Sequence, residues 1–189
     1  MRDTIRVDGF EAVFAEHSDP WGTYQRRDEA VKRQAILRAA GRTRGRALEL
    51  ACGNGSNTCA LQRHSLRLLA LDGAPSAVRI TRERACSPRV DVREALLPID
   101  APREPFDLIV IAEVLYYLRA SEIAQLARRL RLAPGGRLVL AHHHIDFPDT
   151  SSRPAEVHAM LRAGLAQRVV PVSHTRNSRW RVEGLAAPR

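Results

Sequence analysis

The stretch LELACGNGSNTCAL, residues 48–61, decides the fold of this chain. An apolar run with one acid, Glu49, leads directly into Gly53 and Gly55, and a helix-like pattern follows at once. Glycines cost backbone entropy on folding unless the local geometry requires them. The stretch therefore predicts a buried strand, a tight turn that lets another group approach the backbone, and a helix.

Strand-like and helix-like segments alternate along the rest of the chain. Strands are expected at 46–52, 66–72, 89–96, 106–114 and 136–144, and helices at 28–41, 57–64, 74–85, 121–132 and 154–166. Two final strands, at 168–174 and 179–187, lie too close in sequence for a crossover helix, so they should pair antiparallel. The pattern predicts an α/β, Rossmann-like, seven-stranded and mostly parallel sheet with an antiparallel last strand and helices on both faces.

Length and composition favour one domain and a cytoplasmic enzyme. The 189 residues predict a single domain, with an N-terminal helical cap over 1–42 and a core over 43–189. No apolar run approaches the roughly 18 residues that span a bilayer, and the first twenty residues lack the apolar region of a secretion signal. Three cysteines without metal-ligand spacing are typical of reduced thiols.

The net charge of +9 raises the question of a nucleic-acid partner. Lys32 is the only lysine among the 30 basic residues, and the arginines are scattered along the chain. This skew indicates a compositional bias more than selection for phosphate binding. A nucleic-acid partner is therefore disfavoured.

Three ligands compete for the glycine turn. A phosphate-binding P-loop requires a lysine that is missing here, and a dinucleotide site favours glycine or alanine where this chain has Thr58. S-adenosylmethionine needs only close backbone approach, which Gly53 and Gly55 allow. Asp72 ends the second strand, where a carboxylate can accept both ribose hydroxyls, and Glu94 and Ala95 follow the third strand, where an adenine edge would lie.

These residues, taken in order, resemble the class I S-adenosylmethionine-dependent methyltransferases. The pattern Glu49-x-x-x-Gly53-x-Gly55, then Asp72, then the segments 94–98, 106–118 and 132–140 follow that family's motifs over roughly residues 44–144. Ala51 stands where many members have glycine. The resemblance implies a methyl donor that leaves as S-adenosylhomocysteine, and it implies donor contacts from Trp21, Glu49, Gly53, Gly55, Asp72, Glu94, Ala95 and Glu113.

A narrower resemblance concerns the acceptor. Residues 19–21, DPW, together with 106–118, FDLIVIAEVLYYL, are similar to the NodS-like nodulation N-methyltransferases. The similarity is weak past residue 145. It implies an amine acceptor on a chitooligosaccharide or amino sugar. Because the length leaves little for a lid domain, we expect residues 1–40 and the 144–156 loop to supply the acceptor site.

Candidate catalytic residues follow the fourth and fifth strands. Tyr117 could orient an amine, and a histidine of the run at 142–144 could accept its proton, since imidazole titrates near neutral pH. Strand alternation places His142 and His144 on one side and His143 on the other. A metal triad of His142, His144 and Asp146 is an alternative, but methyl transfer to an amine needs no metal, so none is expected.

Three other functions stay open at this stage. A small-molecule O- or N-methyltransferase would carry the same donor site. An RNA methyltransferase is less favoured, because the segment after the fourth strand lacks the [DNS]PP[YFW] pattern of base-amine enzymes. A binding module that kept the fold without the chemistry is the third, and the intact acids and glycines argue against it.

Overall fold

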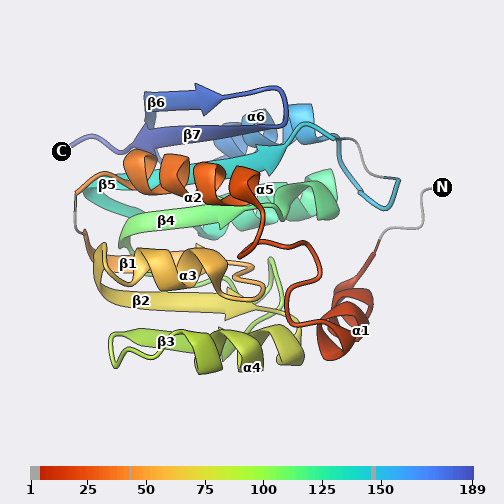
Figure 1. Ribbon diagram of the computed structural model, residues 1–189. Coiled ribbons are helices and arrows are strands. Elements are labelled where there is room, and N and C mark those ends of the chain that lie inside the picture. Colours follow the sequence, from red (N-terminus) through yellow and green to blue (C-terminus); the bar gives the residue numbers. More distant parts are fainter. Residues whose placement is uncertain (1–4, 43, 146–147) are drawn as a thin grey trace.

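The computed structural model describes residues 5–42, 44–145 and 148–189 (Figure 1). Its helices are α1 (Val7–Glu16), α2 (Arg27–Ala40), α3 (Ser56–Leu61), α4 (Pro75–Arg84), the 3-10 helix η1 (Leu115–Tyr117), α5 (Ala120–Arg129) and α6 (Pro154–Gly164). Its strands are β1 (Arg44–Leu50), β2 (Ser65–Asp72), β3 (Val90–Glu94), β4 (Phe106–Ala112), β5 (Leu132–His143), β6 (Val170–Arg176) and β7 (Trp180–Ala186).

The strands form one seven-stranded sheet in the order β3-β2-β1-β4-β5-β7-β6. The pairs among β1, β2, β3, β4 and β5 are parallel, whereas β7 runs antiparallel to both β5 and β6. The predicted fold class is therefore confirmed. Figure 1 shows the sheet from β6 at the top to β3 at the bottom.

Both faces of the sheet are covered, which explains the almost uninterrupted apolar sequence of β4. Leu108 and Val110 belong to the same cluster as Ile36 of α2, while Ile109 and Ile111 pack with residues of α5 and α6 on the opposite face. Burying an aliphatic side chain of this size stabilises the fold by about 1.5–3 kcal/mol. Alternate residues of one strand thus hold the two helical layers in place.

The N-terminal region, expected as a helical cap, has two parts with different surroundings. Ala35, Ile36 and Ala39 of α2 are buried in the cluster that contains residues of β5 and β7, so this helix is part of a core layer. The first helix, α1, lies instead against α4 beyond the strand ends (Figure 1). The domain boundaries remain a prediction.

The expected start of the fifth strand is wrong. The sequence Ala133-Pro134-Gly135-Gly136 suggested a break, but β5 already begins at Leu132, which pairs with Phe106. A register shift between Phe106 and Leu108, together with a positive φ of 69° at Gly135, accommodates the irregular segment within the sheet. Across 5–42, 44–145 and 148–189, no helix is both long and apolar enough to cross a membrane.

Candidate active site

A cleft of about 640 Å³ lies across the carboxyl ends of the parallel strands. From β1 the chain builds β2 and β3 on one side and then returns to β4 on the other, so the strand order reverses between β1 and β4. Ligands of open α/β sheets bind at such switch points. The cleft walls come from the turn after β1, the ends of β2 and β5, the segment after β4, α1 and the start of α2.

The turn after β1, residues 51–55, is termed the glycine loop. Its backbone enters the left-handed region three times, at Ala51 (φ 56°), Gly53 (φ 55°) and Gly55 (φ 80°). A Cβ on Gly55 would lie 3.0 Å from side-chain atoms of Thr81, whose hydroxyl donates to the carbonyl of Gly53 at 2.8 Å. Glycine is therefore required at 55, and glycine would also suit position 51, where this chain carries alanine.

Asp72 holds the glycine loop against the end of β2. Its carboxylate accepts the backbone N–H groups of Gly53 at 2.8 Å and Ala74 at 2.9 Å. Burial raises the pKa of Asp72, and these backbone hydrogen bonds oppose the rise. A carboxylate offers about four acceptor positions, so Asp72 can still accept hydroxyl groups from the cleft that it lines.

Several residues expected to contact the donor lie outside the cleft walls. Glu49 is 2% exposed and accepts the hydroxyl of Thr58 at 2.6 Å behind the glycine loop, and burial raises its pKa to about 8. Glu94 is exposed, whereas Ala95 faces the cleft. The expected residues that line the cleft are Trp21, Gly53, Asp72, Ala95, Glu113, Tyr117 and His143; those that do not are Glu49, Gly55, Glu94 and His142.

Aromatic rings form one wall of the cleft. The ring centroids of Phe10 and Tyr117 are 4.9 Å apart, and those of Phe14 and Trp21 are 5.2 Å apart. Trp21 is 43% exposed, so much of its ring is free to contact a ligand. Burial raises the pKa of Tyr117 to about 12, so its hydroxyl remains a hydrogen-bond donor at neutral pH.

The turn that carries Trp21 is tied to the glycine loop by Asp19. The Asp19 carboxylate accepts the backbone N–H of Thr23 and the side-chain amide of Asn54, both at 2.7 Å. The DPW segment therefore positions an aromatic residue relative to the glycine loop.

Four charged side chains at the other end of the cleft form what we term the charge quartet: Glu29, Lys32, Glu113 and His143. The Lys32 Nζ lies 3.0 Å from Glu29 Oε1 and 2.6 Å from Glu113 Oε1. The His143 ring reaches the same two acids, with Nε2 3.1 Å from Glu29 Oε1 and Nδ1 2.9 Å from Glu113 Oε1. Each carboxylate therefore contacts both cations.

The quartet shifts the titration of its own members. Burial alone would lower the pKa of His143, but its hydrogen bonds to Glu113 and Glu29 outweigh burial and raise the pKa to about 9. Burial alone would raise the pKa of Glu113, but His143 and Lys32 hold it well below its ordinary value. At neutral pH the quartet thus contains two anions and two cations.

The backbone at Glu113 is adapted to this arrangement. Glu113 has φ 59°, an uncommon value for a residue with a side chain. Its second carboxylate oxygen accepts the Tyr116 hydroxyl at 2.7 Å and the backbone N–H of His143 at 3.1 Å. Such strained positions gather at functional sites, where the surrounding contacts hold them.

His142 lies outside the cleft, as strand alternation from His143 requires. It is 1% exposed, and its ring centroid is 4.4 Å from that of His158 on α6. Burial lowers its pKa to about 4. We therefore leave His142 out of the proposed catalytic groups. The alternative metal triad includes Asp146, which lies outside the described residues.

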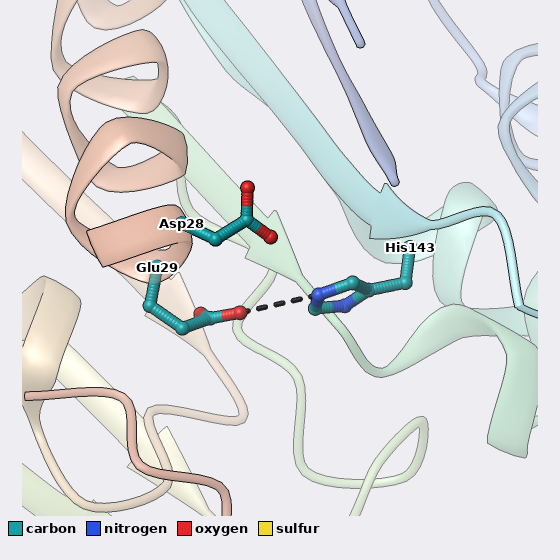
Figure 2. Close-up of side chains that lie close together, drawn as sticks. All are labelled: Asp28, Glu29 and His143. Carbon is teal, nitrogen blue, oxygen red and sulfur yellow. Dashed lines mark ion pairs between the residues drawn. The ribbon is translucent and has the colours of Figure 1, made fainter. Parts of the chain in front are cut away.

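Figure 2 shows the grouping closest to a metal site, in which Asp28 and Glu29 of α2 face His143 at the end of β5. Their ligand atoms lie within 4.8 Å of one another. The Lys32 ammonium lies 3.0 Å from Glu29 and 3.4 Å from His143 Nδ1, so two of the three candidate ligands already contact a cation. The geometry favours an ion-pair cluster over a metal site.

Sequence reasoning missed half of the quartet, namely Glu29 and Lys32. One signal was available, because Lys32 is the only lysine of an arginine-rich chain and lies three residues after Glu29, on the same helix face. Its position next to residues 113 and 143 could be known only from the fold.

Comparison with known proteins agrees with the resemblance seen in the sequence. A family model described as a methyltransferase domain matches residues 48–138. Together with the sheet order and the glycine loop, this match supports the resemblance to the class I S-adenosylmethionine-dependent methyltransferases.

The chain is also similar to nodulation protein S. It is 35% identical to nodulation protein S of Rhizobium tropici over 136 residues, 64% of this chain and 53% of that protein. It is 32% identical to nodulation protein S of Sinorhizobium fredii over 135 residues, 64% of this chain and 59% of that protein. The chain spans little more than half the length of these curated relatives.

A solved structure matches over a greater share of both chains. The N-methyltransferase NodS from Bradyrhizobium japonicum WM9, crystallised with S-adenosylhomocysteine, superposes with a TM-score of 0.81 at 23% identity. The match covers 97% of this chain and 98% of that chain. At this identity the likeness establishes a shared fold.

Proposed function

We propose that the protein transfers a methyl group from S-adenosylmethionine to an amine, and that the acceptor is an amino sugar or a partly deacetylated chitooligosaccharide. One observation carries the proposal: the glycine loop with Asp72 and the charge quartet line the same cleft. The first can hold a donor and the second a polar acceptor group.

The donor end of the cleft fits the amino-acid and nucleoside parts of S-adenosylmethionine. The positive φ angles turn the backbone of Gly53 and Asn54 toward the cleft without a Cβ at 53. Asp72 would accept the ribose hydroxyls, and Ala95 leaves room for the adenine. When bound, the donor supplies an electrophilic methyl group on a sulfonium, and alignment of the acceptor is then the main task of the protein.

The acceptor end combines aromatic faces with acids, which is the chemistry that an amino sugar requires. Trp21 and Tyr117 offer faces for a sugar ring. The carboxylates of Glu29 and Glu113 line the same cleft and can accept an N–H group of the bound amine. The likeness to the N-methyltransferase NodS supports an amine acceptor over a hydroxyl. The resemblance of residues 19–21 and 106–118 to the nodulation N-methyltransferases supports a sugar amine.

A labelled-methyl transfer screen tests the proposal. The purified protein is incubated with labelled S-adenosylmethionine and glucosamine, deacetylated chitooligosaccharides, small amines or RNA. We expect transfer to the amino sugars and none to N-acetylglucosamine, which differs only in its blocked amine. Transfer only to RNA would contradict the acceptor, and an absence of calorimetric heat with S-adenosylhomocysteine would contradict the donor.

A pair of tyrosine variants locates the acceptor. Tyr117→Phe removes a hydroxyl that faces the cleft, whereas Tyr24→Phe removes one that contacts Cys59 outside it. We expect Tyr117→Phe to lower kcat/KM by about tenfold, the usual loss for one hydrogen bond, and Tyr24→Phe to change it little. Equal effects would contradict the assignment of Tyr117.

A further inference from the structure

The geometry of His143 selects one protonation state. Each of its ring nitrogens faces a carboxylate oxygen, Nε2 toward Glu29 and Nδ1 toward Glu113. A neutral imidazole has one N–H and one lone pair. Either neutral tautomer would therefore point a lone pair at a carboxylate oxygen 2.9–3.1 Å away. The Lys32 ammonium is more distant from both ring nitrogens, at 3.4–3.5 Å, so the closer contacts favour an imidazolium. In this state His143 has no lone pair and cannot accept a proton.

The quartet is electrically balanced before any acceptor arrives. Glu29 and Glu113 carry two negative charges, which the ammonium of Lys32 and the imidazolium of His143 neutralise. These side chains are 12%, 25%, 4% and 21% exposed, respectively, so water screens their charges poorly. An acceptor that arrives as an ammonium adds a fifth charge and makes the site net positive.

The surrounding charges leave this balance unchanged. Asp28 is the other acid of α2 near His143. Its carboxylate lies 4.0 Å from the guanidinium of Arg179, just before β7, so the two charges offset each other. Behind Glu113, the Tyr116 hydroxyl is a neutral donor, and burial raises its pKa well above the ordinary value. His142 lies on the opposite side of β5 and is neutral at pH 7, because burial lowers its pKa.

We propose that binding of a cationic acceptor expels a proton from His143, so that the quartet exchanges one positive charge for another. The imidazolium proton goes to solvent as the ammonium enters, and one ring nitrogen of His143 then carries a lone pair. That nitrogen takes a proton from the ammonium, which leaves a neutral amine able to attack and restores the imidazolium. The overall cycle releases one proton per methyl group transferred, as charge balance requires.

This inference rests on the proposed amine methylation, but its test does not depend on turnover. The probe is N,N,N-trimethylglucosamine, a permanent cation with no ammonium proton of its own. Its binding enthalpy is measured near pH 7.5 in phosphate and in Tris, whose ionisation enthalpies differ, and the difference gives the protons released per molecule bound. Any proton released must therefore come from the protein.

We expect about one proton released for the unaltered protein and close to none for His143→Gln, as linkage requires when the titrating group is removed. The matched control is His144→Gln, whose imidazole is exposed and lies outside the cleft lining; it should release as much as the unaltered protein. N-acetylglucosamine, which is neutral, should release no proton. Saturable binding without proton release, or no saturable binding of the cation, overturns the proposal.

The charge of His143 in the free protein gives a second measurement. The carbon shifts of its imidazole, followed by NMR against pH, should titrate near 9. A midpoint below pH 7 would overturn the proposal without any ligand. Methyl transfer to an amine with no proton release on binding would refute the exchange and leave the proposed function standing. Proton release on binding without any methyl transfer in the screen would refute the proposed function and leave the proton exchange standing.

Discussion

The two ends of the cleft are built in contrasting ways. The glycine loop and Asp72 lie within about one strand-helix-strand unit, and the loop is fixed by backbone hydrogen bonds to one carboxylate. The quartet joins side chains of α2, the segment after β4 and the end of β5. A local sequence motif can specify the first, whereas only the assembled sheet creates the second. The two ends should therefore respond differently to substitution.

The largest expected effect is at Asp72. Asp72→Ala removes the acceptor for the backbone amides of Gly53 and Ala74 and the proposed ribose contact, so we expect affinity for S-adenosylhomocysteine to fall at least about 100-fold, equivalent to about 3 kcal/mol. Calorimetry measures the change. Asp91→Ala is the control, since that exposed carboxylate bonds only to Arg93. Unchanged donor affinity in Asp72→Ala would mean that the donor does not use this end of the cleft.

The second effect is the pH dependence of the quartet. The folded-state pKa of His143, about 9, lies above the 6.5 of an unperturbed histidine. The contacts of the charged His143 therefore stabilise the folded state. This contribution is complete below about pH 6.5 and is lost as the pH rises to about 9, and its size is about 3 kcal/mol. Urea unfolding at several pH values should show the loss in the unaltered protein and in His144→Gln, but not in His143→Gln. If the free energy of unfolding falls equally with pH in all three proteins, groups other than His143 cause the loss of stability.

The third effect concerns sterics in the glycine loop. Gly55→Ala combines a positive φ with a Cβ 3.0 Å from Thr81, so we expect the free energy of unfolding to fall by about 2–3 kcal/mol. Gly135→Ala has a similar φ, but its Cβ would meet only the flexible Arg189 side chain at 3.5 Å, and about 1 kcal/mol should be lost. Denaturant unfolding of both variants isolates the steric part. Equal losses of unfolding free energy in the two variants would show that the Thr81 side chain moves away from the added Cβ.

The smallest expected effect is at position 51, where this chain has alanine and many methyltransferases have glycine. Ala51→Gly relieves a left-handed conformation worth about 1 kcal/mol, but glycine's greater freedom in the unfolded chain cancels most of that gain. We expect a change in unfolding free energy within about 0.5 kcal/mol. Ala60→Gly, within α3, should instead cost about 1 kcal/mol. If both variants lose the same amount, the backbone at 51 is not strained.

The outcome of the sequence predictions follows the same division. Strand alternation placed His142 and His144 together and His143 opposite, and the structure confirms this, with the His142 and His144 rings 5.9 Å apart. Alternation predicts which histidines share a face of the strand, but it does not predict which of the two faces points into the cleft. The start of β5 was missed because glycine and proline are typical of loops, while here they form an irregular strand segment.

The sequence by itself determined the alternation of strands and helices, the antiparallel end of the sheet, the glycine loop and the position of Asp72, because periodicity and turn geometry act between near neighbours. The tertiary structure alone decided that Glu49 lies behind the loop and that Lys32 meets Glu113 and His143. Such encounters depend on how α2 packs across β5 and β7, and charge pairing between distant residues leaves no period in the chain.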